Sequence, residues 1–523
     1  MSPKKEYGDF QTPLSLARRV VALLEQEATY IKTVIEPTCG VGAFLQAVAE
    51  SLGTSPDYYG FDLNADYVQT AGTTLARLGL RRDIVEQRDF YDIDWRQFIS
   101  EKNNRLLIIG NPPWITNAGM GAIGGHNLPQ KSNFQGHGGF AARTGKANFD
   151  ISEWMLMKLV EALQGKESVM AMLCKTATAR KVLRHAWVNG LDIGPSSLHL
   201  IDAAAEFGVS VDACLLYTHT GIGASESTAT VYRSLSFDEP LQTFGLFAGE
   251  LVSDIDTYRE LRDLEGLEYR RWRSGVKHDA AKVMELTREN GHFVNGLGER
   301  WELEEEYLYP LLKSSDLANS RLRPERLVLL TQRNVGDSTD EIKHIAPKTW
   351  RYLLEHGRQL DKRGSSVYAN RARFAVFGVG EYSFAPAKVA ISGLYKNLHF
   401  QSIGSFAGKP VMVDDTCYFI PCDTKPEADF FANLLNSETA QRFISALVFT
   451  DAKRPVTIDV LKRIDLTKLA EHVGQETMAV EYLSSPSLEC SHQRLLVFEK
   501  RGLYRTKKSS EPRKGRGRAS RGR

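Results

Sequence analysis

The chain has 523 residues, of which 42% are hydrophobic and 25% are charged. This composition is typical of a globular protein with a sizeable core, and the length predicts two or three domains. No apolar run approaches the roughly 18 residues that a membrane span needs, and no apolar stretch follows the first charged residues. We therefore expect a cytoplasmic protein without a membrane partner.

The net charge of +2 conceals an asymmetry along the chain. Residues 500–523 carry eleven Lys and Arg side chains against Glu511 alone, which is +10, so residues 1–499 sum to −8. A polyanionic partner must therefore meet a local basic surface or this tail. We expect residues 486–523 to be a basic, largely disordered tail that adds salt-sensitive attraction to phosphates, or else only solubility.

Cysteine and histidine spacing gives no sign of a metal site. The six cysteines include no Cys-x-x-Cys pair, and the twelve histidines show no His-Glu-x-x-His spacing. Structural zinc sites need four well-spaced Cys or His ligands. We therefore expect reduced structural thiols and no metal.

Apolar runs alternate with helix-like segments over the first 220 residues, which is typical of a parallel sheet covered by helices. Helical periodicity covers residues 14–27, with Thr12 and Pro13 as the expected cap and first turn. The predicted strands, in chain order, cover residues 34–35, 58–61, 106–109, 169–173 and 214–217. Eight glycines fall between residues 115 and 148, which predicts a long loop in this region.

The pattern becomes irregular beyond residue 223, where aromatic residues stand beside basic ones, as in residues 269–273. We predict a domain boundary here. The expected organisation is an α/β domain over residues 1–222, a mixed α+β domain over residues 223–485, and the tail.

A glycine turn follows the first predicted strand, in Glu36-Pro-Thr-Cys-Gly-Val-Gly-Ala-Phe44. Gly40 and Gly42 allow a tight turn and a close approach of the backbone to a ligand. Asp62 lies twenty residues past Gly42, at the end of the next strand, where its carboxylate can accept hydrogen bonds from both ribose hydroxyls. A Gly-x-Gly turn alone is often structural, but with this acid it predicts a nucleoside-cofactor site.

The tetrapeptide Asn111-Pro112-Pro113-Trp114 follows a third strand at the same edge of the sheet. It could be a proline turn with one exposed aromatic residue. A chemical interpretation is more specific, because the Asn111 oxygen and the Pro112 carbonyl can accept both hydrogens of a nucleobase amine. The amine lone pair then points at an electrophilic methyl group, while Trp114 offers a face on which the base stacks.

These motifs together resemble the adenine-specific DNA methyltransferases that use S-adenosylmethionine, of the gamma group found in type II restriction–modification systems. Trp114 stands where this group more often has Tyr or Phe. Further resemblance covers both halves of the chain, in residues 10–13, 146–154, 207–214, 274–279 and 451–455.

The resemblance implies a Rossmann-like methyltransferase domain followed by a DNA target-recognition domain. It also implies roles for single residues. The methionine part of the cofactor would contact Thr12, Thr38, Cys39 and Gly40, with Glu36 in the same pocket. The ribose would be held by Asp62, and the cofactor adenine would lie against Leu63, Asp89 and Phe90. The catalytic residues would be Asn111, Pro112, Pro113 and Trp114, with Phe207 stacking on the other face of the target base.

Some of these residues also have simpler interpretations: Phe207 alone could belong to the core, and Asp89 could cap a turn. The expected partners are double-stranded DNA and a separate cognate restriction endonuclease, with the enzyme itself a monomer. Three other functions stay open. They are methyl transfer to an RNA base or a protein glutamine amide, methyl transfer to N4 of cytosine, and DNA binding without catalysis.

Overall fold

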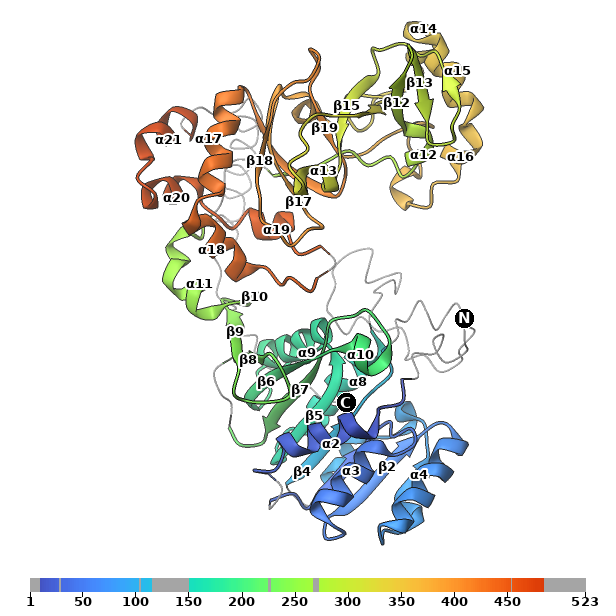
Figure 1. Cartoon of the computed structure of the whole chain (residues 1–523), viewed down its shortest axis with the longest axis vertical. Coiled ribbons are helices and arrows are strands. Elements are labelled where there is room, and N and C mark those ends of the chain that lie inside the picture. Colours follow the sequence, from blue (N-terminus) through green and yellow to red (C-terminus); the bar gives the residue numbers. More distant parts are fainter. Residues whose placement is uncertain are drawn as a thin grey trace, which may run out of the picture. The chain divides into compact units, whose positions relative to one another are not determined.

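The computed structural model describes residues 10–27, 30–102, 105–114, 150–223, 227–266, 272–452 and 454–483. The chain forms two compact units (Figure 1). Unit 1 contains residues 1–260 and 445–453, and unit 2 contains residues 261–444 and 454–523. The loop predicted at 115–148 and the tail predicted at 486–523 lie outside the described residues.

A ten-stranded sheet with the order β10-β9-β8-β6-β7-β5-β4-β1-β2-β3 forms the centre of unit 1. Strands β3, β2, β1, β4 and β5 run parallel, whereas β7 is antiparallel to both of its neighbours, β5 and β6. The strands are β1 (Thr33–Glu36), β2 (Asp57–Asp62), β3 (Val85–Gln87), β4 (Leu106–Gly110), β5 (Ser168–Lys175), β6 (Ile193–Ile201), β7 (Ala213–Thr220), β8 (Thr228–Tyr232), β9 (Pro240–Phe247) and β10 (Glu250–Val252). All five predicted strands are confirmed, in β1, β2, β4, β5 and β7.

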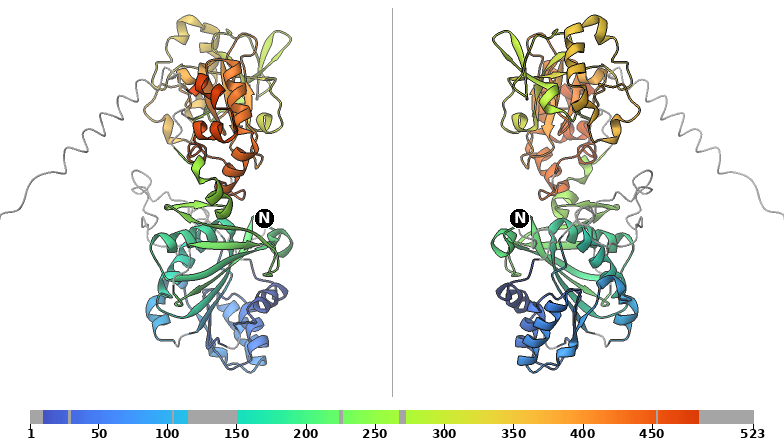
Figure 2. Two further views of the ribbon diagram at one scale, coloured as in Figure 1. Left: turned by 90° about the vertical axis from the view of Figure 1, so that its left-hand side faces the viewer. Right: turned by 90° about the vertical axis from the view of Figure 1, so that its right-hand side faces the viewer.

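Helices cover both faces of this sheet (Figure 2). One face packs against α2 (Leu14–Leu23), α3 (Ala43–Leu52), α4 (Ala65–Arg77) and α10 (Ala203–Phe207). The other face packs against α5 (Trp95–Ser100), α8 (Ile151–Ala162) and α9 (Thr176–Val188). A last helix, α11 (Ile255–Leu261), follows β10. This three-layer arrangement confirms the α/β, Rossmann-like fold class.

The central strands are apolar on both faces because both faces are covered. In β4, Leu106 and Ile108 join the core beneath α5 and α8, whereas Leu107 and Ile109 join the core beneath α2 and α3. A strand buried on both faces has no alternation of polar residues, so it reads as a continuous apolar run in the sequence. That is why these strands were predictable.

The domain boundary predicted at residues 222/223 is wrong. Residues 228–252 form three further strands at the edge of the same sheet, with β8 pairing alongside β6. Residues 445–453 also return to unit 1, where Asp451 forms a two-point ion pair with Arg180, at 2.6 and 2.7 Å. Short edge strands with half-exposed faces carry no long apolar run, which is why the sequence pattern looked irregular there.

The first helix is shorter than predicted and capped differently. Helix α2 ends at Leu23 instead of residue 27, and its N-cap residue is Pro13, without a side-chain cap. The Thr12 hydroxyl instead accepts a hydrogen bond from Asn111 Nδ2, at 3.3 Å. Thr12 therefore contacts Asn111 and does not cap the helix.

Unit 2 is a mixed α+β structure with two sheets, of the orders β11-β20-β17-β18 and β14-β13-β12-β16-β15-β19. Its strands are β11 (Arg273–Ser274), β12 (Glu285–Glu289), β13 (His292–Asn295), β14 (Arg300–Trp301), β15 (Leu308–Leu312), β16 (Arg326–Leu329), β17 (Ala387–Ser392), β18 (Gln401–Ile403), β19 (Met412–Val413) and β20 (Cys417–Cys422). Its helices are α12 (Ala281–Met284), α13 (Ser314–Ala318), α14 (Ile342–Ile345), α15 (Pro347–Glu355), α16 (Gly357–Asp361), α17 (Lys425–Leu435), α18 (Glu438–Leu447), α19 (Ile458–Leu461), α20 (Leu466–His472) and α21 (Glu476–Leu483). The expectation of a second, mixed domain is confirmed.

Within the described residues, no helix is long and apolar enough to span a membrane. The same residues hold no group of three or more His, Cys, Asp and Glu side chains that could bind a metal ion.

Candidate cofactor and catalytic site

A cavity of about 500 Å³ opens at the carboxyl ends of β1, β2 and β4. Strand β1 is the point where the order of the sheet reverses, because the chain goes first to β2 and β3 on one side and then to β4 on the other. Ligands of open α/β sheets bind at this place, since the loops diverge there. The volume suits a ligand of nucleoside size.

The turn from β1 into α3 forms the floor of the cavity. Gly40 and Gly42 have φ values of +51° and +82°, in the left-handed region that favours glycine. A Cβ on Gly42 would lie 2.9 Å from the Cβ of Ala71, so any side chain there would push α3 away from α4. Gln11 holds this turn in place, because its Oε1 accepts a hydrogen bond from the Val41 N–H at 3.1 Å.

Asp62 stands beside this turn, at the end of β2, as its spacing predicts. Its Oδ2 accepts a hydrogen bond from the Gly40 N–H and its Oδ1 from the Asn64 N–H, both at 2.8 Å. These bonds fix the carboxylate at the rim of the cavity. Each carboxylate oxygen has a second lone pair, so the group can still accept bonds from a ligand.

Glu36 is buried at the end of β1, with 2% of its surface exposed. Burial raises the pKa of its carboxyl group well above the usual value. A hydrogen bond from the Leu45 N–H, at 3.2 Å, lowers this pKa, and the nearby Asp62 charge raises it. Burial and the same two carboxylates also raise the pKa of the Cys39 thiol. Cys39 is therefore no nucleophile and serves as a small lining group.

Asn111 has its side-chain amide oriented by the N-terminal segment. Its Nδ2 donates to the Phe10 carbonyl at 3.1 Å and to the Thr12 hydroxyl at 3.3 Å. Its Oδ1 is buried and has no hydrogen-bond partner among the described residues. An unpaired buried acceptor is costly in a folded protein, so it marks a position that a ligand donor is expected to fill.

Three aromatic rings form a cluster beside Asn111. Trp114 contacts Phe207 edge to face, with ring centroids 5.2 Å apart, and Phe10 lies 6.1 Å from both. Phe207 is the last residue of α10, the short helix between β6 and β7. Both of these strands are separated from β4 by β5 in the sheet. The fold therefore brings together two aromatic residues that are 93 positions apart in the sequence.

Most of the predicted site residues meet in this one cavity. Its lining includes Thr12, Glu36, Thr38, Cys39, Gly40, Asp62, Leu63, Asp89, Phe90, Asn111 and Pro113. Gly42, Pro112, Trp114 and Phe207 are not part of the lining. Gly42 instead shapes the turn, and the two aromatic residues pack beside Asn111. Asp89 lines the cavity, and its Oδ1 also caps the turn at the Tyr91 N–H, at 3.0 Å, so the cap is confirmed and the cofactor contact stays a prediction.

Several lining residues were not predicted, notably Phe10, Gln11, Tyr67, Tyr91 and Met155. Phe10 and Gln11 directly precede Thr12 in the same sequence motif, so this adjacency could have identified them as lining residues. Tyr67 lies on α4 and Met155 on α8, where helical periodicity alone does not distinguish a cavity wall from the core.

The lining fits a ligand of net positive charge. Glu36, Asp62 and Asp89 supply three carboxyl groups, whereas Arg88 is the single Lys or Arg among the lining residues. S-adenosylmethionine carries a sulfonium and an ammonium group against one carboxylate. Asp62 would accept hydrogen bonds from its ribose, and Phe90 and Leu63 would offer apolar surface to its adenine ring. The residues therefore fit this cofactor.

Comparison with known proteins places the chain in a family. No protein-family model matches it. The type II methyltransferase M.NspV of a Nostoc species is 41% identical over 470 residues, which cover 90% of this chain and 98% of that protein. The type IIL restriction–modification enzyme MmeI, solved in complex with DNA, shares the fold with a TM-score of 0.52 and 12% identity. That alignment covers 86% of this chain and 64% of MmeI.

A type I restriction–modification methyltransferase subunit from Streptococcus thermophilus aligns with 43% of this chain and 47% of its own length, with 18% identity and a TM-score of 0.31. The high identity to M.NspV extends through both units. The chain therefore belongs to the type II methyltransferases of restriction–modification systems and takes its methyl group from S-adenosylmethionine.

Proposed function

We propose that this protein is a site-specific DNA methyltransferase that modifies N6 of an adenine flipped out of duplex DNA. It would act in the cytoplasm as the modification enzyme of a restriction–modification system, as a monomer beside a separate endonuclease. The observation that carries the proposal is the oriented but unpaired Oδ1 of Asn111 at the edge of the cofactor cavity.

The reaction needs little acid–base chemistry from the protein. An adenine amine is a poor nucleophile because its lone pair is delocalised into the ring. Hydrogen bonds from this amine to Asn111 Oδ1 and to the Pro112 carbonyl would draw the nitrogen towards tetrahedral geometry and free the lone pair. S-adenosylmethionine supplies the electrophilic methyl group when it is bound. The anchored Nδ2 of Asn111 prevents the amide from turning its own donor towards the base.

The aromatic residues would hold the target base. Trp114 and Phe207 contact each other edge to face in the structure, so a base can lie between the two rings only after they separate. Stacking on two aromatic faces would offset part of the cost of taking a base out of the duplex. The space between the separated rings would then favour a flat ligand such as a base.

We also propose that unit 2 is the target-recognition domain. Its Ser274–Asp279 motif is tightly held, because the carbonyls of Asp414 and Val413 lie where a Cβ on Gly275 would be, at 2.1 and 2.2 Å. Lys277 in this motif and Arg454 both approach the carboxylate of Asp415, at 3.8 Å each. Basic side chains held on such a rigid scaffold suit contacts with phosphates or guanine edges.

Nucleoside mass spectrometry tests the proposal. The protein would be expressed in a host without DNA methylases, and its DNA would be hydrolysed and compared with DNA from cells carrying the Asn111→Ala variant. We expect N6-methyladenine with the unchanged protein and none with the variant, while the dissociation constant for S-adenosylmethionine stays within a few-fold.

Asn189→Ala is the matched control, because Asn189 lies at the exposed C-terminus of α9 and contacts only His185 among the described residues. Its DNA should be methylated normally. N4-methylcytosine in place of N6-methyladenine would show that cytosine is the acceptor. Unmodified DNA, together with clear cofactor binding, would exclude DNA as the substrate. RNA bases and protein glutamine amides would then be tested.

A further inference from the structure

A lysine outside every predicted motif holds the end of the catalytic tetrapeptide. Lys175 is the last residue of β5, and its Nζ donates to the Trp114 carbonyl at 3.2 Å. The same Nζ forms an ion pair with Asp150 Oδ2 at 2.5 Å. One ammonium group thus joins two residues that are 36 positions apart in the sequence.

The sheet register explains why this lysine can reach Trp114. Strands β4 and β5 are parallel, with Gly110 opposite Met172. Strand β4 therefore ends at Gly110, four residues before Trp114, whereas the neighbouring β5 continues three residues past Met172 and ends at Lys175. The length of a lysine side chain then spans the short remaining separation between the two strand ends.

Asp150 is fixed at its other oxygen. It is the N-cap residue of α8, and its Oδ1 accepts bonds from the Ser152 N–H at 3.1 Å and the Ser152 hydroxyl at 2.5 Å. Its side chain is 9% exposed and that of Lys175 is 25% exposed, so the pair is shielded from water. A shielded, charge-assisted bond with both partners fixed has a defined geometry, unlike a surface ion pair.

The tetrapeptide is then held at both ends. Asn111, at its start, is bonded to Phe10 and Thr12, and Trp114, at its end, is bonded to Lys175. The indole Nε1 of Trp114 is buried without a hydrogen-bond partner among the described residues, so this ring is not oriented by a polar contact of its own in that part of the chain. The position of the ring depends on its backbone and its packing.

We propose that Lys175 is a positioning residue for methyl transfer, which together with Asp150 fixes the Trp114 backbone and so the place where the target base stacks. The inference rests on the proposed function, because it needs Trp114 to contact the base. Lys175 itself contacts neither the cofactor cavity nor a reacting atom.

The test is the single-turnover rate of methyl transfer, with enzyme in excess over a plasmid prepared from a methylase-free host and with tritium-labelled S-adenosylmethionine. Lys175→Met should lower this rate roughly 10–100-fold, because misplacement of a reacting group by about 1 Å has an effect of this size. Cofactor affinity should be unchanged, since Lys175 lies outside the cavity lining. Lys175→Arg keeps the charge and should restore part of the rate.

Lys181→Met is the matched control. Lys181 lies on α9 and pairs with the buried Glu153 of α8 at 2.7 Å, so its loss removes another lysine ion pair to α8 without touching Trp114. Its rate should match the unchanged protein. Asp150→Asn serves as a second variant, because Asn still caps a helix but cannot form the ion pair, and it should lower the rate in the same direction.

The outcomes separate this inference from the proposed function. If Lys175→Met is no slower than Lys181→Met, Lys175 has no positioning role. The same conclusion follows if the rate and cofactor affinity of Lys175→Met fall together, or if Lys175→Met does not fold and Asp150→Asn keeps the full rate. In each of these cases the proposed function stands as long as Asn111→Ala is inactive. Full activity of Asn111→Ala would instead remove the proposed mechanism and, with it, the basis for Lys175.

Discussion

Glu36 is a buried carboxyl group in the cavity whose lining fits a cationic cofactor. Burial raises its pKa, so a proton that the unfolded chain loses near pH 4.5 is kept by the folded protein to higher pH. The contribution of this group to stability is therefore largest below pH 4.5 and falls as the pH rises towards the folded pKa. A cation bound in the same cavity favours the carboxylate and should expel the proton.

We predict that S-adenosylmethionine binding near neutral pH releases a fraction of a proton, and that the Glu36→Gln variant loses this release. Calorimetric titration in two buffers with different ionisation enthalpies measures the effect, because released protons add the heat of buffer ionisation. Glu50→Gln, on α3 but paired with Arg18 at the surface, is the control and should behave normally. Equal heats in both buffers for the unchanged protein would contradict the prediction, because they would show that Glu36 does not lose a proton when the cofactor binds.

At the scale of the element, predictability followed burial and periodicity. The strands β1, β2, β4, β5 and β7 were predictable because their residues are buried on both faces, and the Asp62 spacing followed from the βαβ unit. The hydrogen bond between Thr12 and Asn111 could not be predicted, because a contact across 99 positions leaves no local signal in the sequence. Thr12 was therefore expected to cap the helix. A local signal is likewise absent for Lys175 and for the return of residues 445–453 to unit 1.

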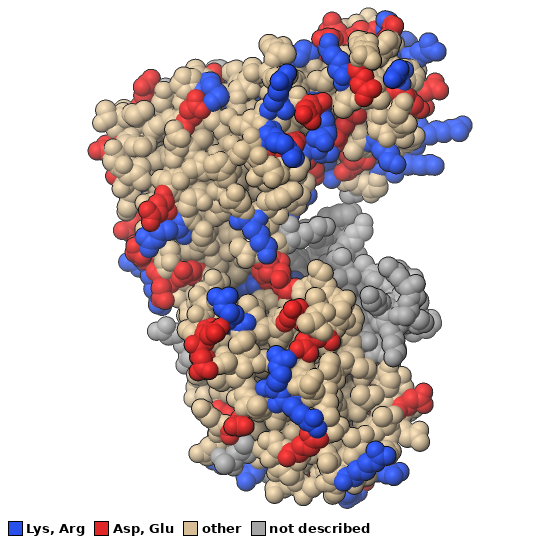
Figure 3. Space-filling model, viewed as in Figure 1, with Lys and Arg blue, Asp and Glu red and all other residues tan. Residues whose placement is uncertain are grey.

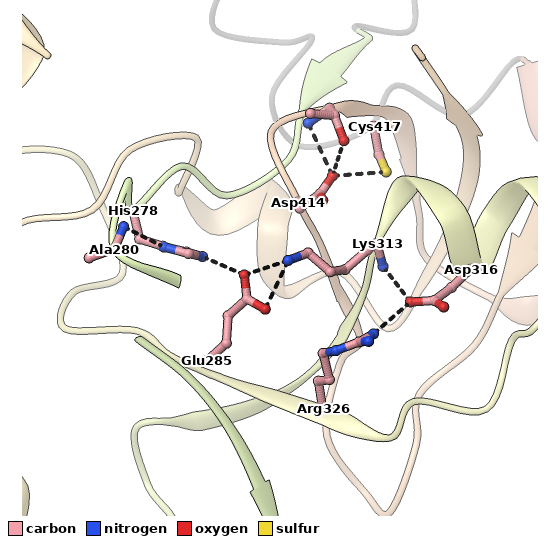
Figure 4. Close-up of polar contacts among 9 residues, drawn as sticks. His278, Ala280, Glu285, Lys313, Asp316, Arg326, Asp414 and Cys417 are labelled. Atoms are coloured by element: carbon pink, nitrogen blue, oxygen red, sulfur yellow. Dashed lines mark hydrogen bonds and ion pairs between the residues drawn. The ribbon is translucent and has the colours of Figure 1, made fainter. Parts of the chain in front are cut away.

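A polar network in unit 2 connects β12, α13 and β16 (Figure 4). Glu285, at the start of β12, accepts from Lys313 Nζ at 2.7 Å and lies 3.4 Å from His278 Nε2. The backbone N–H of Lys313 donates to Asp316, which also pairs with Arg326. Burial alone would raise the pKa of Glu285, but the hydrogen bonds from His278 and Lys313 outweigh it and hold the pKa below the usual value.

Replacing Glu285 by Gln should therefore lower the stability of unit 2 near neutral pH, by roughly 1–3 kcal/mol, because Gln offers His278 and Lys313 only one acceptor oxygen and no negative charge. The lowered pKa means that the contribution is present above pH 4.5 and is lost as the pH falls through the folded pKa, so the two proteins should converge in acid. Urea unfolding followed by hydrogen exchange of β12 peptides measures this difference.

Glu305→Gln provides the comparison, since Glu305 pairs with Arg288 at the surface, where both side chains are more than half exposed. Such a pair contributes about 0–1 kcal/mol. A Glu285→Gln protein as stable as the Glu305→Gln protein at pH 7 would mean that the network does not stabilise unit 2.

At the scale of the whole molecule, charge is distributed unevenly along the chain but mixed on its surface. Acidic and basic side chains are interspersed on the face shown in Figure 3, and many of them pair with each other. On the described part of this face, no broad basic field is offered to DNA. The excess of positive charge lies in residues 500–523, outside the described residues, and the rest of the chain sums to −8.

We predict that removal of residues 500–523 weakens DNA binding mainly at low salt and leaves the methylated site unchanged. Each phosphate neutralised by the protein contributes about 0.9 to the slope of log affinity against log salt concentration, so the loss of eleven cationic side chains should lower this slope by several units if most of them contact phosphates. Filter binding or fluorescence anisotropy at four salt concentrations gives the slope.

A full-length variant with the tail Lys and Arg residues changed to Gln separates charge from chain length, and should match the truncated protein. An unchanged slope in both proteins would show that the tail does not contact DNA, and the basic residues of unit 2 would then have to supply the attraction.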